Sequence, residues 1–234
     1  MSSSLQAISL SGLVWAFAPT LVVLVILYRW GLDTKSSLHA VTRMLVQLLL
    51  IGYVLLFIFE TKHAGVIISV LGLMLVAASW IALRPVRHKQ PHLYRNALIA
   101  NLVGGGLTLG LTTQVVLEVQ PWFLPRYVVP LAGMLFASSM NAVSLAAERY
   151  EAECGGGRPY ADARNSAFQA ALIPVTNSLF AVGIVSLPGM MTGQILSGVS
   201  PLIAAKYQIV IMCTIFGSAG ISAAIYLRLA KGQA

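Results

Sequence analysis

The chain has 234 residues, of which 58% are hydrophobic and only 9% charged, whereas about 25% of the residues in a soluble globular protein are charged. Its 15 Lys and Arg residues against 7 Asp and Glu residues give a formal net charge of +8. The hydrophobicity excludes a disordered chain, and two cysteines, Cys154 and Cys213, are too few for a disulfide scaffold. The composition therefore predicts an all-α polytopic membrane protein.

Seven apolar segments can cross a hydrocarbon core of about 30 Å, which requires about 20 helical residues. In chain order they are residues 10–28, 44–59, 66–83, 97–117, 128–147, 171–187 and 207–227, and the sixth is short. None has a full charge at its centre, where one would cost at least about 2.5–3.5 kcal/mol. No composition shift separates a soluble domain, so residues 1–234 are predicted to form one transmembrane domain.

The basic residues lie mainly in alternate connections between these segments. Twelve of the 15 would share one side of the membrane: Arg29, Lys35, Arg43, Arg84, Arg87, Lys89, Arg95, Arg149, Arg158, Arg164, Arg228 and Lys231. Only Lys62, Arg126 and Lys206 would lie on the other side. Because cytoplasmic loops are enriched in Lys and Arg, the N-terminus is predicted outside and the C-terminus in the cytoplasm.

Familiar enzyme motifs are absent from the sequence. It contains no GxxxxGK[ST], HExxH, CxxC or GxSxG, so neither a nucleotide loop nor a common hydrolytic site is predicted. The run Gly104 to Gly106 lies inside an apolar helix, which favours close helix packing through Gly106 and Gly110. His88 and His92 have a metal-binding spacing, but the basic residues around them favour a lipid-facing loop.

Residues 148–169 form the most highly charged connection, with four acidic and three basic side chains. The glycines at 155–157 predict a chain break, and the following Arg-Pro-Tyr-Ala predicts a short helix with Pro159 in its first turn. Such a helix on the cytoplasmic side is suited to docking another protein. The alternative is a solvated connecting loop.

Residues 186–201 contain three glycines, two prolines and no charge. This composition breaks a helix, and the freed backbone groups must be buried in protein or face water. The segment is predicted to be a gate, a re-entrant turn or part of a substrate path. Met190 and Met191 could bind a soft metal, although flexible packing is the favoured interpretation. The side-chain amides inside the spans are interpreted as forming hydrogen bonds between helices: Gln47, Asn101, Gln114, Asn141, Asn177 and Gln194.

The residues at 171–178, 182–196, 200–201 and 206–209 carry a resemblance to a known family. The runs ALIPVTNS, VGIVSLPGMMTGQIL, SP and KYQI resemble the FetB-type permeases, the membrane subunits assigned to iron-export ABC transporters. Plant aluminium-tolerance half-transporters are related to that family. The length and the seven spans agree over the whole chain, whereas the N-terminal half matches mainly in pattern. The stretch from Cys154 to Ala161 departs from the usual turn of that family, so the docking role carries over to this segment without individual contacts.

The resemblance implies a homodimeric permease subunit in the bacterial inner membrane, exporting iron or another metal ion. This chain would bind no cofactor, and ATP would be used by a separate ABC-type ATP-binding subunit. Coupling to that subunit would involve Glu151, Gly157, Pro159, Tyr160, Ala161 and Arg164. Signature or path residues would be Pro174, Asn177, Pro188, Gly189, Met190, Met191, Thr192, Gly193 and Gln194. No metal ligands are assigned.

Three alternatives remain open on the sequence. One is a stand-alone secondary carrier or channel, although no buried acid–base relay is visible. The second is an ABC permease for an organic solute such as a sugar nucleotide, and the third is a membrane scaffold or receptor without transport.

Overall fold

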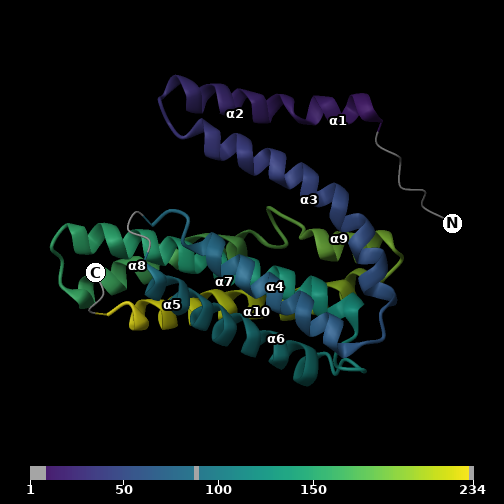
Figure 1. Ribbon diagram of the computed structural model, residues 1–234. Coiled ribbons are helices and arrows are strands. Elements are labelled where there is room, and N and C mark those ends of the chain that lie inside the picture. Colours follow the sequence, from purple (N-terminus) through teal and green to yellow (C-terminus); the bar gives the residue numbers. More distant parts are fainter. Residues whose placement is uncertain (1–8, 87–89, 232–234) are drawn as a thin grey trace. The chain divides into compact units, whose positions relative to one another are not determined.

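The computed structural model describes residues 9–86 and 90–231, which are helices joined by turns, with no β-strand among them (Figure 1). The chain divides into two compact units, residues 1–61 and 62–234. His88 lies outside the described residues, so the lipid-facing loop favoured around it stays a prediction. The all-helical membrane architecture predicted from the composition is confirmed.

Unit 1 is a pair of long helical segments. Helix α1 (Leu10–Ala16) continues into α2 (Ala18–Arg29) at Phe17, and the two together form the first predicted span. Gly31 has a φ of 68°, which suits glycine in the turn to α3 (Thr34–Glu60), and Asp33 caps α3 by accepting from the Ser36 amide. Helix α2 buries none of its residues, so its apolar side chains require lipid or another protein around them.

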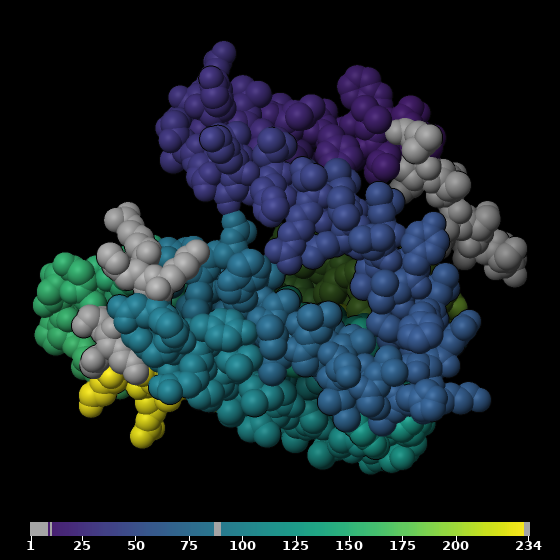
Figure 2. Space-filling view, in the orientation of Figure 1, coloured from purple at the N-terminus to yellow at the C-terminus, as the bar shows by residue number. Residues whose placement is uncertain are grey.

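Unit 2 contains α4 (Ala64–Ala82) and a long helical segment that changes its winding. That segment comprises α5 (Pro91–Asn101), the π-helix η1 (Leu102–Gly106), α6 (Leu107–Gly110) and the π-helix η2 (Leu111–Val116). Then come α7 (Pro125–Gly155), α8 (Tyr160–Ala181), α9 (Gly189–Leu196) and α10 (Pro201–Leu229). Helix α7 packs against α4, α8 and α10, and Figure 2 shows α4 beside α5 on the near face.

Six segments of the described chain are long and apolar enough to cross a membrane, and α8 is not among them. Its 22 residues correspond to about 33 Å. The C-terminal ends of α7 and α10 meet, because the Tyr150 hydroxyl donates to the Ala230 carbonyl at 3.4 Å. The N-terminal end of α8 lies there too, since the Tyr160 hydroxyl donates to the Leu227 carbonyl at 3.1 Å. Helix α8 therefore runs back along α7 and α10 from that end, and the number of membrane-crossing segments is close to the seven predicted.

Several predicted boundaries are wrong because helices continue beyond their apolar parts. The second span begins at Thr34 rather than near residue 44, and the seventh begins at Pro201 rather than near residue 207. The predicted connection at 148–169 is helical except for residues 156–159. Hydropathy locates the lipid-facing part, but Ala, Glu and Arg are strong helix formers that extend a helix into water.

Small residues bring the helices of unit 2 close together. The main buried cluster includes Ala97, Ala146, Ala167 and Ala223 from four different helices. In η1, a Cβ on Gly104 would lie 2.7 Å from the Ser222 amide nitrogen, and one on Gly105 would lie 2.8 Å from the Phe136 ring.

Close packing through the glycine run is therefore found, but the predicted pair of glycines is wrong. A Cβ on Gly106 would meet only its own helix at 3.7 Å, and one on Gly110 would meet nothing within 4 Å. The close contacts are made by the first two glycines of the run, which are buried in the π-helix at 102–106.

Candidate functional site

Residues 148–169 form a two-helix projection that we call the handle. Helix α7 has 31 residues, so it is about 46 Å long, whereas the hydrocarbon core is about 30 Å thick. Its charged C-terminal turns and the first turns of α8 therefore extend past the apolar part of the bundle. The turn at 156–159 and the C-terminal part of α10 lie at this same end of unit 2 (Figure 1).

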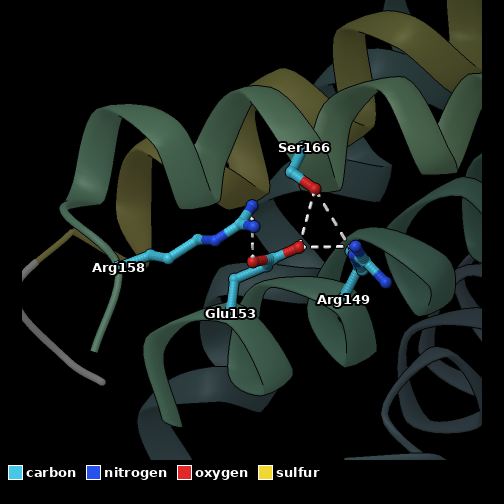
Figure 3. A network of polar contacts seen from close by, with 4 residues as sticks. All are labelled: Arg149, Glu153, Arg158 and Ser166. Carbon is cyan, nitrogen blue, oxygen red and sulfur yellow. Dashed lines mark hydrogen bonds and ion pairs between the residues drawn. The ribbon is translucent and has the colours of Figure 1, made fainter. Parts of the chain in front are cut away.

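A carboxylate joins the two helices of the handle (Figure 3). Glu153 Oε1 lies 2.6 Å from Arg149 Nη2, and Glu153 Oε2 lies 3.0 Å from Arg158 Nη1. The Ser166 hydroxyl on α8 donates to Glu153 Oε1 at 2.8 Å and accepts from Arg149 Nε at 3.4 Å. Glu153 is only 7% exposed, so the network ties α7 to α8 in a partly dry environment.

This network also favours the ionised form of Glu153. Residue 153 lies beyond the apolar part of α7, which ends near residue 147. The hydrogen bond from Ser166, supported by the charges of Arg149 and Arg158, holds the pKa of Glu153 below its ordinary value. The carboxylate is therefore charged at neutral pH, and both arginines have a partner for their positive charge.

Two tyrosines connect the handle to α10. The Tyr150 and Tyr160 rings meet edge to face, with centroids 6.1 Å apart. Their hydroxyls donate to the Ala230 and Leu227 carbonyls near the end of α10. Three helices are thus joined at one end of the bundle.

The turn of the handle follows from its glycines and its proline. Gly157 has a φ of 76°, and its amide donates to the Cys154 carbonyl at 2.9 Å, which ends α7 in the manner of a glycine C-cap. Pro159 is the N-cap of α8 rather than a member of its first turn, because α8 begins at Tyr160. Its carbonyl accepts from the Asp162 and Ala163 amides.

A groove lies on the membrane-crossing part of α7, α8 and α10. It has a volume of about 320 Å³ and includes Ser138, Asn141, Pro174 and Ser178 in its lining. Asn141 is exposed in the single chain, and so is Asn177 on α8. Polar side chains at membrane depth normally face protein or a water-filled cavity rather than lipid. This face of α7 and α8 is therefore suited to contact with another protein surface or with a water-filled cavity, rather than with lipid.

A second cavity, the outer cavity, lies at the opposite end of unit 2 from the handle. It has a volume of about 300 Å³ between the start of α7, α9 and the start of α10. Arg126, Tyr127 and Tyr207 line it together with Met190 and Gln194 of α9. Gln194 Oε1 is buried and has no hydrogen-bond partner among the described residues. A buried amide oxygen without a partner is costly, and a ligand or water in the cavity could satisfy it.

Comparison with known proteins gives the family. A family model described as "Uncharacterised protein family (UPF0014)" matches residues 10–159 and 157–233. The chain belongs to the UPF0014 family. No solved structure matches it.

Three UPF0014 relatives illustrate the range of the family. The Escherichia coli "Probable iron export permease protein FetB" is 33% identical over 215 residues, which cover 85% of this chain and 81% of FetB. The Arabidopsis thaliana "Protein ALUMINUM SENSITIVE 3" is 33% identical over 232 residues, covering 91% and 84%. The rice "UPF0014 membrane protein STAR2" is 34% identical over 209 residues, covering 83% and 72%.

The six residues predicted to couple this UPF0014 protein to an ATPase all lie in the handle. Gly157, Pro159 and Tyr160 form its turn and the start of α8. Arg164 is exposed one helical turn later, with its guanidinium carbon 5.7 Å from the Tyr160 ring centroid. Ala161 is exposed, whereas Glu151 is half-buried beside a different cavity that Tyr150 and Cys154 also line. Their docking role stays a prediction.

The nine predicted signature or path residues do not form one site. Pro174 lines the groove, and Met190 and Gln194 line the outer cavity. Pro188 is the N-cap of α9, and Asn177, Gly189 and Gly193 are exposed. Met191 and Thr192 are half-buried and line neither the groove nor the outer cavity. The predicted helix break is found on both sides of α9, but a short helix occupies the middle of the segment.

The described residues of this UPF0014 protein contain no group of three or more His, Cys, Asp or Glu side chains that could hold a metal ion. Of the two methionines, Met190 lines the outer cavity and Met191 does not, and their binding of a soft metal stays untested.

The sequence reasoning missed Glu153 and Ser166. The i, i+4 spacing of Arg149 and Glu153 could have indicated their ion pair. No local pattern reveals Ser166, because it is 13 residues from Glu153 and on the next helix.

Proposed function

We propose that this chain is the membrane-spanning permease subunit of an ABC transporter in the bacterial inner membrane. A separate ATP-binding subunit hydrolyses the ATP, and this chain binds no cofactor of its own. Three observations support the proposal: a relative named as a permease, a sequence without a GxxxxGK[ST] loop, and a rigid handle extending past the membrane.

The observation that carries the proposal is the Glu153 network. A docked ATPase moves the tip of the handle when its own subunits close. Because Glu153 holds Arg149 and Arg158 and accepts from Ser166, α7 and α8 move as one body rather than bending at the turn. Tyr150 and Tyr160 extend that connection to α10. Two alternative positions of this three-helix body would provide the two-state element that alternating access requires.

The groove supports a homodimer. Asn141 and Ser178 lie on a face of α7 and α8 that is open in the single chain. A second copy packed over this face removes these polar groups from lipid and allows hydrogen bonds between helices. The solute path then runs between the two copies, with the groove as part of its wall.

The substrate we propose is iron or another metal ion, moved outward. The name of the FetB relative supports this choice. An organic anion is the alternative substrate, favoured by the Arg126, Tyr127 and Tyr207 side chains around the outer cavity.

The proposal is tested with inverted membrane vesicles containing this chain with and without its ATP-binding partner. ATP-dependent accumulation of Fe²⁺ is expected only when both proteins are present. A control partner with its nucleotide-binding lysine replaced should give no accumulation. Uphill movement by the purified chain alone, in liposomes with an ion gradient and no ATPase, would establish a stand-alone carrier instead.

A second experiment separates docking from transmission of motion. Replacing Gly156, Gly157 and Pro159 by flexible Gly-Ser segments on either side of a retained Arg158 removes the tight turn but keeps every side chain of the Glu153 network. We expect a loss of ATPase binding and of transport with normal membrane insertion. Transport at the normal rate in this variant would reject docking at the turn.

A further inference from the structure

A third cavity, the basic cavity, lies beside the handle between the first turns of α8 and the end of α10. It has a volume of about 540 Å³. Arg164, Arg228 and Lys231 line it with Tyr160, and Phe168 and Leu227 provide apolar walls. Tyr160 and Arg164 are also among the residues predicted to couple the chain to an ATPase, whereas Arg228, Lys231 and Phe168 are not.

Positive charge is concentrated here without compensation. The Arg164 guanidinium carbon lies 5.7 Å and the Lys231 Nζ 5.5 Å from the centroid of the same Tyr160 ring. No acidic side chain lines the cavity, and neither of the Glu153 ion pairs, with Arg149 and with Arg158, involves a residue of its lining. Three cations held together repel one another, and an anion among them would relieve that repulsion.

The geometry of the donors suits a phosphate group. Arg164 uses Nε and Nη2 on Asn165 Oδ1, at 3.2 and 2.9 Å, which leaves its other N–H groups available. Guanidinium groups bind phosphate oxygens in pairs, and an ammonium adds a point charge. The N-terminus of α8 and the C-terminus of α10 both lie close by, and their opposite dipoles largely cancel. The attraction for an anion therefore comes from the three side chains.

The apolar walls distinguish a lipid from a soluble phosphate. Phe168 lies two helical turns after Tyr160 on α8, on the way to the apolar part of that helix, and Ala224 occupies the corresponding position on α10. A free phosphate would gain nothing from these side chains, whereas an acyl chain would bury its methylene groups against them. The cavity also lies at the end of the bundle where the basic residues are concentrated, and the cytoplasmic leaflet is the anionic one.

We propose that the basic cavity binds the phosphate headgroup of an anionic phospholipid, with an acyl chain along Phe168 and Ala224. The headgroup bridges Arg164 on α8 to Arg228 and Lys231 on α10. It thereby fixes the base of the handle against α10 at the membrane surface. This inference does not depend on the ATP-binding partner.

The test uses the purified full-length chain and native mass spectrometry, with phosphatidylglycerol, phosphatidylcholine and soluble glycerol 3-phosphate as probes. We expect a tightly retained phosphatidylglycerol and no comparable retention of the other two. Because each basic side chain near a membrane surface adds about 1 kcal/mol of attraction, each cation removed should weaken binding about five-fold. Arg164→Gln, Arg228→Gln and Lys231→Gln together should therefore weaken it on the order of a hundred-fold.

The matched control removes the same charge from the same predicted side of the membrane, through Arg29→Gln, Lys35→Gln and Arg43→Gln. It should retain the lipid.

A second variant, Ala224→Trp, keeps every charge but fills the cavity, and it should lose the lipid while remaining folded by circular dichroism. Equal losses in both triple variants, or unchanged retention in Ala224→Trp, would overturn the proposal, and binding of glycerol 3-phosphate as tight as that of phosphatidylglycerol would replace the lipid by a soluble phosphate.

Discussion

At the handle end of unit 2, the carboxylate of Glu153 is buried with two arginines and a serine hydroxyl around it. At the opposite end, Gln194 Oε1 is also buried, but no described residue donates to it. Both groups are polar and shielded from water, and they differ in whether the protein itself satisfies them. The first arrangement stabilises one structure, whereas the second leaves a group that another structure or a ligand would satisfy better.

The glycines follow the same division. Gly104 and Gly105 lie nearer the handle than α9 does. They allow their helix to approach Ser222 and Phe136 more closely than any larger residue would permit. In α9, a Cβ on Gly189 or Gly193 would meet nothing within 4 Å. The segment around α9 also has two glycines at positive φ, Gly183 and Gly198. We infer that the handle end transmits motion as a rigid body, and that the α9 end rearranges.

Gly104→Ala should produce the largest effect, because it breaks the close contact between η1 and α10. The new Cβ would lie 2.7 Å from the Ser222 amide nitrogen, a backbone atom that cannot rotate away. Overpacking of this kind costs about 1–3 kcal/mol, so a lower midpoint of thermal unfolding in detergent is expected. Gly110→Ala is the control, because its Cβ has open space. Equal unfolding midpoints for the two variants would contradict the tight packing at Gly104.

Glu153→Ala should uncouple the handle without removing it. Arg149 and Arg158 lose their shared partner, so α7 and α8 can separate while residues 156–161 still present the docking turn. We expect normal binding of the ATP-binding subunit and about a ten-fold loss of ATP-driven transport, within the usual range of coupling energies. Glu148→Ala, an exposed position on the same helix, should behave as wild type. Parallel loss of binding and transport would show that Glu153 belongs to the docking surface instead.

The sequence was sufficient for the class of fold and the number of crossings. Lipid imposes a simple requirement on each span, about 20 apolar residues with satisfied backbone groups, and this requirement is visible in composition alone. It was insufficient for the length of the handle helices, because hydropathy marks where the apolar part of α7 ends and does not show how far the helix continues into water. Pro159 and the glycines at 155–157 marked the turn correctly, but they could not show how short it is.

The candidate sites were less predictable because they depend on contacts between distant residues. Met190 and Gln194 were chosen from their segment, yet the outer cavity also requires Arg126, Tyr127 and Tyr207 from two other helices. The basic cavity likewise combines Arg164 with Arg228 and Lys231, more than 60 residues apart. The closely packed glycines, Gly104 and Gly105, lie in a π-helix, which no simple periodicity reveals.

Gly189→Leu tests whether the α9 end moves during transport. In the structure the position is exposed and open, so membrane insertion and the unfolding midpoint should change little, as at most surface sites. If the segment closes against another surface during the cycle, the leucine obstructs it and transport falls. We expect a loss of about five-fold, at the low end of coupling effects. Wild-type transport by Gly189→Leu and by Gly193→Leu would indicate that α9 stays open throughout the cycle.

Gln194→Leu should change the free energy of unfolding least. The direction of that change, compared with the change in transport, shows whether the buried amide has a function. Leucine has a similar size and removes a buried oxygen that lacks a partner, so the unfolding free energy should stay the same or rise by up to about 1 kcal/mol. Transport should fall, because the leucine can hydrogen-bond neither to the solute nor to a donor that the rearranged state would bring to this position. Gln114→Leu is the control, since the Gln114 amide is exposed and already donates to Thr113. A variant that is both stabilised and less active is the expected result where a site keeps an unsatisfied group for function. A stabilised variant with full transport would instead mean that Gln194 is a packing defect, and the outer cavity would lose its role in the path.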